Sequence, residues 1–550
     1  MASKIVYYPS AERGVLFMNL DMILKDGIFL TPTGMYEGSL GVRDGKIVRF
    51  DSYDNLKSQY DTNNVINLEN KTVFPGFIDS HIHLVQTGFQ KINVDLSEAK
   101  SLQHLKELIR LEATKKKPGE WIIGMSFNNN NFTGEQRFPT KYDLDEAAPD
   151  NPVFITRVCT HLMAANSKTL QMASIDRDTI APEGGEIDRN TDGEPVGILR
   201  RNAGDLVYEI IYTDRQMIKK AIRASLHYLK ENGITTAHSM AIGVKNPEHY
   251  MNIMKAYEEA LEEENNPVRV ILGAEYAILD HLADNSIGFL QGNDYFKQGY
   301  IKFFTDGSYG SRTAFLNEPY EDEPENCGIA ATSEKDLLSY TKKAHDLGYQ
   351  CAIHALGDRA LTRALDVLEK ISENGKNPLR HRLVHASLAP ERLIKRIKEL
   401  GLSVDIQPNF VSSEAHWLES ALGSRISDMY AWKTMKEHGI YQAAGSDSPV
   451  EPVNPFYGVR SAVTRQNWNN FPPEGFNAAE KLAIPDVIEM YTINGARQYF
   501  EENLKGSIEA GKFADLVVLS ANPLRLKHTD ELLKINVEKT FVNGRLVYAE

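Results

Sequence analysis

Two histidines separated by one residue, His81 and His83, end the apolar stretch PGFIDSHIHL at residues 75–84. In an extended chain, side chains two residues apart point to the same side, so both imidazoles face one way while Ile82 faces the other. Imidazole nitrogens are common ligands of zinc and other transition metals. The pair therefore suggests two ligands of one metal ion, although such a short motif, taken alone, more often marks one core and one surface histidine.

Four further residues that could do chemistry stand in or just after apolar runs. They are Lys302 in YIKFFTDGS, His354 in CAIHALGDRA, His385 in RLVHAS and Asp447 in AAGSDSP. Each alone is weak evidence, since a lysine in such a run can also be a surface residue with an apolar stem. Together with the two histidines they favour a metal site, provided that the fold brings the ends of these runs together.

Eight apolar runs predict the strands that must position these residues. They lie at 75–81, 234–238, 268–273, 299–304, 350–354, 382–385, 403–407 and 440–445. Helical patterns with charged faces separate most of them, at 214–231, 246–264, 334–347, 358–374, 389–399 and 428–438. This alternation predicts an α/β fold, a parallel (β/α)8 TIM barrel, in which the carboxyl ends of the strands face the active site.

Two regions fall outside the barrel pattern. Residues 1–74 and 499–550 show extended runs with Asp-Gly and Asn-Gly hairpin signals, which predict one small β-sandwich domain built from both termini. Residues 90–213 are far longer than an ordinary strand-to-helix connection, so we expect an inserted subdomain over the barrel mouth. The barrel would then consist of residues 75–89 and 214–498.

The bulk composition excludes several classes of protein. The net charge of −14 argues against nucleic acid or an anionic membrane as a partner, since both are bound through clustered lysine and arginine. No run approaches the ~18 apolar residues of a membrane span, and the first residues lack the apolar stretch of a signal peptide, so we expect a cytoplasmic protein. Cys159, Cys327 and Cys351 have no C-x-x-C spacing, which excludes a disulfide framework and a thiolate zinc site.

Several stretches resemble the metal-dependent amidohydrolase superfamily, and more closely its branch, amidohydrolase family 3, that contains N-substituted formamide deformylase. They are TVFPGFIDSHIHL, IKFFTDGSYGSRTAFL, IHALGDRAL, RLVHASL, GSDSPVEPVNPFYGVRSAVTR and GSIEAGKFADLVVLSANPL, with GMSFNNNNF and THLMAANSKTL in the inserted region. The resemblance covers nearly the whole chain in the order of the family. It implies a hydrolase of a non-peptide amide or formamide C–N bond.

The resemblance also implies a centre of two divalent metal ions. The ligands would be His81, His83 and Asp447 for one ion, His354 and His385 for the other, and Lys302 between them. A lysine can bridge cations only after it loses its charge, and in this superfamily the bridging lysine is N-carboxylated by carbon dioxide. A mixed nitrogen and oxygen ligand set suits Zn²⁺ best, with Mn, Co or Fe as alternatives.

The implied reaction is attack of a metal-activated hydroxide on a small-molecule amide. Two metal ions would lower the pKa of a water between them to near 7, and one would polarise the scissile carbonyl. Asp447 would take the proton and pass it to the leaving amine, which makes it the catalytic residue. We expect a carboxylate and an amine as products and no nucleic-acid or membrane partner, and the chain could form a homodimer.

Six further residues are candidate substrate contacts. Asp306 and Arg312 follow the fourth strand, Asp358 and Arg359 follow the fifth, and Phe127 and His161 lie in the inserted region. Loops at these places line the mouth of a barrel, so contact with the substrate or with the metal ligands is expected. The alternative is an Asp–Arg network that only orders the loops.

Two other functions share this scaffold. A deaminase of the same superfamily usually uses one metal ion and a glutamate near the fifth strand, where this chain offers only Asp358. A catalytically inactive regulatory or binding protein would typically have lost metal ligands, whereas all six candidate ligands are present here. Two bound metal ions per chain would favour the hydrolase, one the deaminase, and none the inactive protein.

Overall fold

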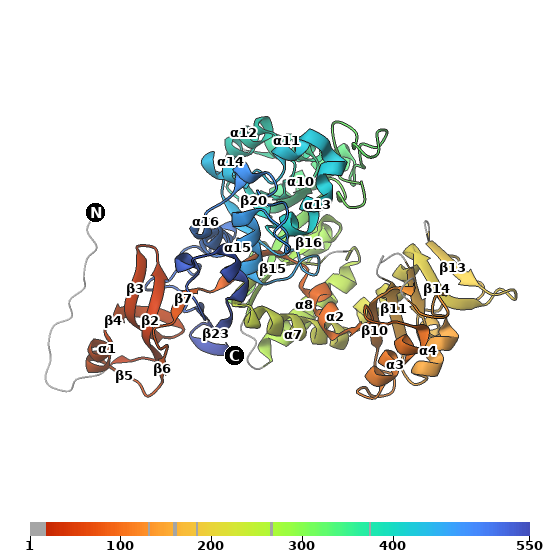
Figure 1. Ribbon diagram of the computed structural model, residues 1–550, viewed down its shortest axis with the longest axis horizontal. Coiled ribbons are helices and arrows are strands. Elements are labelled where there is room, and N and C mark those ends of the chain that lie inside the picture. Colours follow the sequence, from red (N-terminus) through yellow and green to blue (C-terminus); the bar gives the residue numbers. More distant parts are fainter. Residues whose placement is uncertain are drawn as a thin grey trace.

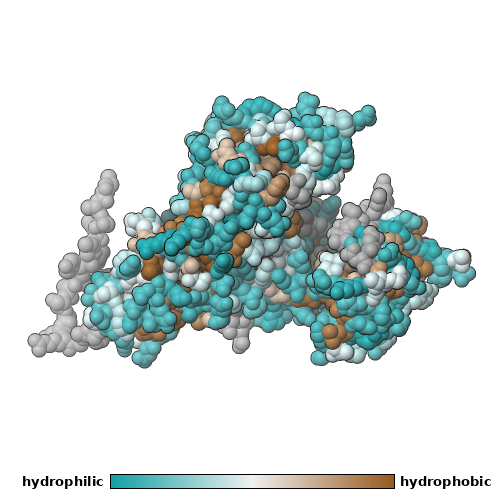
Figure 2. Space-filling model, in the orientation of Figure 1, coloured by the Kyte–Doolittle hydropathy of each residue, from teal (hydrophilic) through white to brown (hydrophobic). Residues whose placement is uncertain are grey.

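The computed structural model describes residues 18–129, 132–157, 162–182, 185–241, 243–263, 268–372 and 376–550. These residues form a sheet of terminal strands, a central barrel, and an inserted region on the far side of the barrel from that sheet (Figure 1). No helix among them is long and apolar enough to cross a membrane. The face seen in Figure 2 is mostly hydrophilic, as expected for helices that turn their charged sides outward.

The barrel is an eight-stranded sheet in which hydrogen-bonded neighbours run parallel. Its strands are β8 (Phe77–Ile82), β15 (Ile234–Met240), β16 (Arg269–Glu275), β17 (Phe296–Phe304), β18 (Cys351–Ala355), β19 (Arg382–His385), β20 (Ser403–Ile406) and β21 (Gln442–Ala444). All eight overlap the apolar runs of the sequence, because strands buried on both faces are almost continuously apolar. The predicted fold class is confirmed.

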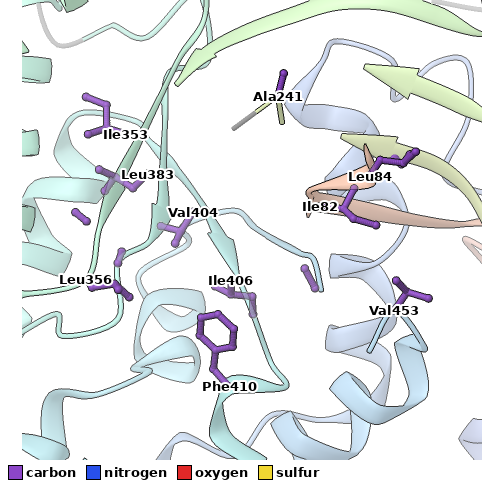
Figure 3. Close-up of a cluster of buried hydrophobic side chains, with 14 of the residues drawn as sticks. Ile82, Leu84, Ala241, Ile353, Leu356, Leu383, Val404, Ile406, Phe410 and Val453 are labelled. Atoms are coloured by element: carbon purple, nitrogen blue, oxygen red, sulfur yellow. The ribbon is translucent and has the colours of Figure 1, made fainter. Parts of the chain in front are cut away.

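Helices surround the barrel. The predicted ones are α7 (Arg215–Glu231), α8 (Pro247–Glu262), α10 (Glu334–Asp346), α11 (Asp358–Ile371), α12 (Glu391–Glu399) and α14 (Trp432–Glu437). The sequence reasoning missed α2 (Leu84–Ile92), α9 (Leu279–Asp284), α13 (Phe410–Leu422), α15 (Pro455–Thr464), α16 (Ile484–Met490) and α17 (Ile493–Gln498). Strand residues such as Ile353, Leu383 and Val404 are fully buried in the large core that these helices share with the barrel (Figure 3).

Both ends of the chain contribute to one sheet beside the barrel. Its order is β24 (Arg545–Ala549), β23 (Val537–Val542), β22 (Leu516–Leu519), β7 (Thr72–Pro75), β2 (Met22–Thr31), β3 (Gly34–Arg43) and β4 (Lys46–Asp51), with β6 (Val65–Asn67) paired to β2. Next to it lie helix α1 (Tyr53–Gln59) and the pair β1 (Met18–Asn19) and β5 (Tyr60–Asp61). Gly76 alone separates β7 from β8, so the chain passes directly from this sheet into the barrel.

The inserted region forms a third sheet with its own core. Its order is β13 (Gly185–Arg189), β14 (Pro195–Arg201), β12 (Leu162–Ala165), β11 (Val153–Arg157), β10 (Ile122–Phe127) and β9 (Val94–Asp95). Its helices are α3 (Leu102–Ala113), α4 (Lys141–Ala147), α5 (Ser167–Met172) and α6 (Asp205–Thr213). Trp121, Phe154 and Val207 belong to the same buried cluster as barrel residues, so the region packs against the barrel.

A buried ion pair joins the barrel to the terminal sheet. Arg269, at the start of β16, donates from Nε and Nη2 to the two carboxylate oxygens of Asp515, at 2.9 and 3.1 Å. The two side chains are only 2% and 3% exposed, and the guanidinium lies 4.1 Å from the centroid of the Phe513 ring. A bidentate pair of this kind fixes the orientation of its two elements as well as stabilising them.

We expect the replacement Arg269→Met to destabilise the protein by about 3–5 kcal/mol, because it leaves the Asp515 carboxylate buried without its partner. The double variant Arg269→Met/Asp515→Leu should recover part of that loss. Arg396→Met is the matched control, because its partners Asp366 and Glu369 are 46% and 61% exposed, and it should cost less than about 1 kcal/mol. Urea unfolding checks this, and equal losses for Arg269→Met and Arg396→Met would contradict it.

Candidate active site

The candidate ligands of the barrel converge at one end of the sheet. Asp447 Oδ1 lies 2.9 Å from His83 Nε2 and 3.5 Å from His81 Nε2, and Lys302 Nζ lies 3.3 Å from His81 Nε2. His81, His385 and Asp447 each present one ligand atom within 4.8 Å of the others. The ring centroids of His354 and His385 are 4.6 Å apart. The barrel thus brings together all six residues that the sequence singled out.

The two edge strands of the barrel sheet, β8 and β21, are joined beside these residues by the carboxylate of Asp79. Its Oδ1 accepts from the backbone N–H groups of His81 and Ser446, both at 3.1 Å, and its Oδ2 accepts from Ser446 Oγ at 2.6 Å. Asp447 N donates to His81 O at 2.7 Å, and His83 N donates to Ser448 O at 2.8 Å. These contacts place His81 and His83, at the end of β8, opposite the aspartate that follows β21.

Two of the converging residues have backbone conformations that side chains rarely adopt. His385 has φ 72°, its neighbour Ala386 has φ 45°, and Asp447 has φ 58°. Non-glycine residues in the left-handed region cost roughly 1–3 kcal/mol each and persist only where the surroundings impose them. Such outliers cluster at functional sites, because they aim a side chain in a direction that a regular strand end does not allow.

Burial determines the charge state of the site. It lowers the pKa of His81 and of His385 well below the usual value, with nearby positive groups acting in the same direction, so both rings are neutral near pH 7. Burial alone would raise the pKa of Asp447, but the close contact with His83 Nε2 and the electrostatic influence of His385 and Lys302 hold it below the usual value. Burial lowers the pKa of Lys302 to about 7. The centre therefore combines neutral nitrogens with one carboxylate.

This donor set fits a divalent cation. A neutral imidazole offers a lone pair, and Asp447 Oδ1, although close to two ring nitrogens, makes no hydrogen bond of good geometry among the described residues. Imidazole nitrogens and a carboxylate oxygen that converge in a buried place are typical ligands of zinc and related metals. A cation between them would satisfy buried lone pairs that no proton donor of the described chain reaches.

Asp306 lies close to His354, a candidate metal ligand, and its main contacts are with the backbone of two loops. Its Oδ1 lies 3.3 Å from His354 Nε2 and accepts from Leu356 N at 3.1 Å. Its Oδ2 accepts from the backbone N–H groups of Phe315 and Gly357, at 2.9 and 2.8 Å. The carboxylate is thus saturated by the loops after β17 and β18.

The other expected substrate contacts have different surroundings. Arg312 pairs with Asp322, Asp358 accepts from Asn317, and the Arg359 guanidinium lies over the Phe315 ring. Phe127 is fully buried in the core of the inserted region, which leaves no part of its ring exposed to a substrate. His161 lies outside the described residues. The loop-ordering alternative accounts for the contacts of Arg312 and Asp358.

Three residues near the centre escaped the sequence reasoning: Asp79, Gln407 and Phe410. Asp79 had a detectable signal, because it lies two residues before His81 in a strand and so shares its face. Gln407, whose Oε1 is 2.6 Å from His385 Nδ1, and Phe410, whose ring stacks on His385, had no such signal. They lie just after the seventh barrel strand, β20. The sequence had indicated no candidate metal ligand or catalytic residue after that strand.

The barrel presents a metal-type donor set at its carboxyl end, as metal-dependent hydrolases do. Residues 64–548 match the model of the amidohydrolase family, so the chain belongs to this family of hydrolases that act on carbon–nitrogen bonds of small molecules. The chain is 34% identical to YtcJ of Bacillus subtilis (strain 168) over 514 residues, covering 92% of this chain and 95% of YtcJ.

Two further similarities agree with this assignment. N-substituted formamide deformylase of Arthrobacter pascens is 28% identical over 503 residues, which cover 88% of this chain and 90% of that enzyme. The crystal structure of an uncharacterized metal-dependent hydrolase from Pyrococcus horikoshii OT3 has a TM-score of 0.78 and 27% identity, and the match covers 92% of this chain and 98% of that one. The family resemblance inferred from the sequence motifs is confirmed.

We expect Asp79→Ala to be destabilised by about 2–5 kcal/mol and to bind divalent metal more weakly, because two backbone N–H groups and the Ser446 hydroxyl lose a buried acceptor. Asp79→Asn keeps one acceptor oxygen and should lose clearly less. Urea unfolding and metal titration of both variants check this. Native stability of Asp79→Ala would show that the Asp79 carboxylate does not hold the barrel closed.

Proposed function

We propose that the protein hydrolyses the C–N bond of a small amide or formamide at a centre of two divalent metal ions. The observation that carries the proposal is the convergence of the ligand atoms of His81, His385 and Asp447, with Lys302 beside them, in a chain of the amidohydrolase family. The likeness to a relative named N-substituted formamide deformylase supports the choice of bond.

His81, His83 and Asp447 would hold one ion, and His354 and His385 the other. When bound, such ions supply Lewis acidity, which polarises an amide carbonyl and makes water more acidic. Zn²⁺ suits the mixed nitrogen and oxygen donors best, with Mn, Co or Fe as alternatives. The side chains supply position and proton transfer.

Lys302 would be N-carboxylated and would lie between the two ions. Its Nζ is buried, and burial lowers its pKa to about 7, so a large share of the side chain is the neutral amine at that pH. A neutral amine adds to the carbon of carbon dioxide and releases one proton, which gives a carbamate whose single negative charge is shared by two oxygens. The change turns a group that repels cations into one that binds them.

Asp447 would move the proton. Its pKa lies below the usual value, so it is a carboxylate near neutral pH and can accept a proton from the water that attacks the carbonyl. The same oxygen can then pass the proton to the nitrogen of the leaving amine. Water, amide and carboxylate together account for the products, a carboxylic acid anion and an amine.

A one-metal deaminase is the second candidate. It is favoured by the three donor atoms of His81, His385 and Asp447, which are close enough together to suit a single ion. Lys302 distinguishes the two functions, because a bridging ligand is needed only between two ions. The number of bound ions therefore decides between them.

We expect purified protein to hold close to two divalent ions per chain and to lose its hydrolase activity to chelators. Elemental analysis of metal-replete protein measures the ratio. The variant Lys302→Ala should lose at least one ion, because it removes the proposed bridge. A ratio of one ion per chain that Lys302→Ala leaves unchanged would favour the deaminase.

We expect Asp447→Asn to lower kcat by about 10²–10⁴ while most of the metal stays bound, because the amide keeps one ligand oxygen but accepts no proton. Metal content and kcat are measured on the same preparation. Asp366→Asn, an exposed carboxylate on α11, is the matched control and should keep native turnover. Native turnover of Asp447→Asn would remove this residue from the proposed mechanism.

A further inference from the structure

The segment from Gln407 to Phe410, directly after β20, holds His385 on two sides. Gln407 Oε1 lies 2.6 Å from His385 Nδ1. The Phe410 ring stacks on the imidazole, with centroids 5.8 Å apart and 14° between the planes, and Figure 3 shows Phe410 just beyond Ile406 at the end of β20. Gln407 is 2% exposed, so the contact lies in an interior where hydrogen bonds are strong and water cannot replace them.

This segment is itself held in place. Phe410 N donates to Gln407 O at 3.1 Å and closes the turn that leads into α13. Asn409, 1% exposed, donates from Nδ2 to Pro452 O at 3.1 Å, in the stretch that follows Asp447. The amide of Gln407 is therefore presented from a backbone tied to the loop that carries Asp447.

The position of Gln407 distinguishes the two tautomers of His385. A neutral imidazole carries one N–H, and the amide oxygen can only accept, so the contact requires the proton on Nδ1. The lone pair is then on Nε2, where a metal ion can bind it. With the amide reversed, its NH₂ group would donate to Nδ1, and the proton would be on Nε2, where it would block a cation.

His354 is held in the opposite way. Its Nε2 lies 3.1 Å from Gly307 O and 3.3 Å from Asp306 Oδ1, both acceptors, which requires the proton on Nε2 and leaves the lone pair on Nδ1. Two adjacent histidines are thus set in different tautomers by acceptors from different loops. The acceptor, and not the ring itself, selects which nitrogen is free.

We propose that Gln407 is a positioning residue that fixes His385 in the Nδ1–H tautomer and so makes Nε2 available to the metal ion. The inference rests on the proposed function, because it takes His385 as a metal ligand. Outer partners of this kind typically account for a 10–100-fold change in metal affinity.

The test compares Gln407→Leu with Gln407→Glu. Leucine has a similar size but no acceptor, so the affinity for Zn²⁺, measured by competition with a chromophoric chelator, should fall about 10–100-fold. Glutamate still accepts from Nδ1–H and should keep affinity near that of the native protein. Gln442→Leu, which removes an equally buried glutamine from the other end of the barrel, is the matched control and should leave Zn²⁺ affinity unchanged.

Native affinity in Gln407→Leu, or an equal loss in Gln407→Glu or Gln442→Leu, would overturn the proposal. His385→Ala separates failure of this proposal from failure of the proposed metal centre. If His385→Ala keeps both ions, the proposed function fails. If it loses an ion while Gln407→Leu does not, only the role of Gln407 fails. Nitrogen-15 spectra of histidines in the native metal-free protein give a readout without any change at Gln407. An Nε2–H tautomer for His385, assigned through His385→Ala, would also overturn the proposal.

Discussion

The closure of the barrel between β8 and β21 is the constraint on which the site depends. The hydrogen-bonded order of the sheet ends at these two strands, and Asp79 joins them by accepting from His81 and from Ser446. Burial raises the pKa of Asp79 to about 7, because removal from water disfavours the charged form of the carboxyl group. This unfavourable burial of Asp79 occurs where the histidines of the first barrel strand contact the aspartate that follows the last strand.

The sequence predicted the parts of the fold that depend on burial alone. Each barrel strand is covered on both sides, so each appears as a short apolar run, and the helices between them show one charged face. The ligands could be found for a related reason: a polar residue within or just after such a run has to face a site or a partner. His81, His385 and Asp447 meet as expected, while their roles as ligands and the domain limits stay predictions.

What the sequence could not predict depends on direction and on packing between distant segments. Phe127 lies in the inserted region near a motif of the family, but only the assembled sheet shows that its ring points into the core of that region. Asp306 looked like a mouth residue, yet three backbone N–H groups from two loops converge on it. Gln407 and His385 are 22 residues apart in the chain, and the hydrophobic pattern of the sequence does not indicate that they are in contact.

The buried charges around Lys302 bear on the role proposed for it in a cation site. Arg382 and Asp405 form an ion pair at 2.8 Å with both side chains fully buried, so their charges largely offset one another. Lys302, on β17, forms no salt bridge with a carboxylate among the described residues, and its Nζ faces His81 Nε2. An ammonium group there would be buried beside neutral nitrogens, and any divalent cation bound nearby would repel it. The neutral amine is tolerated, and a carbamate would be stabilised by the same ions, so the metal and the modification would each favour the other.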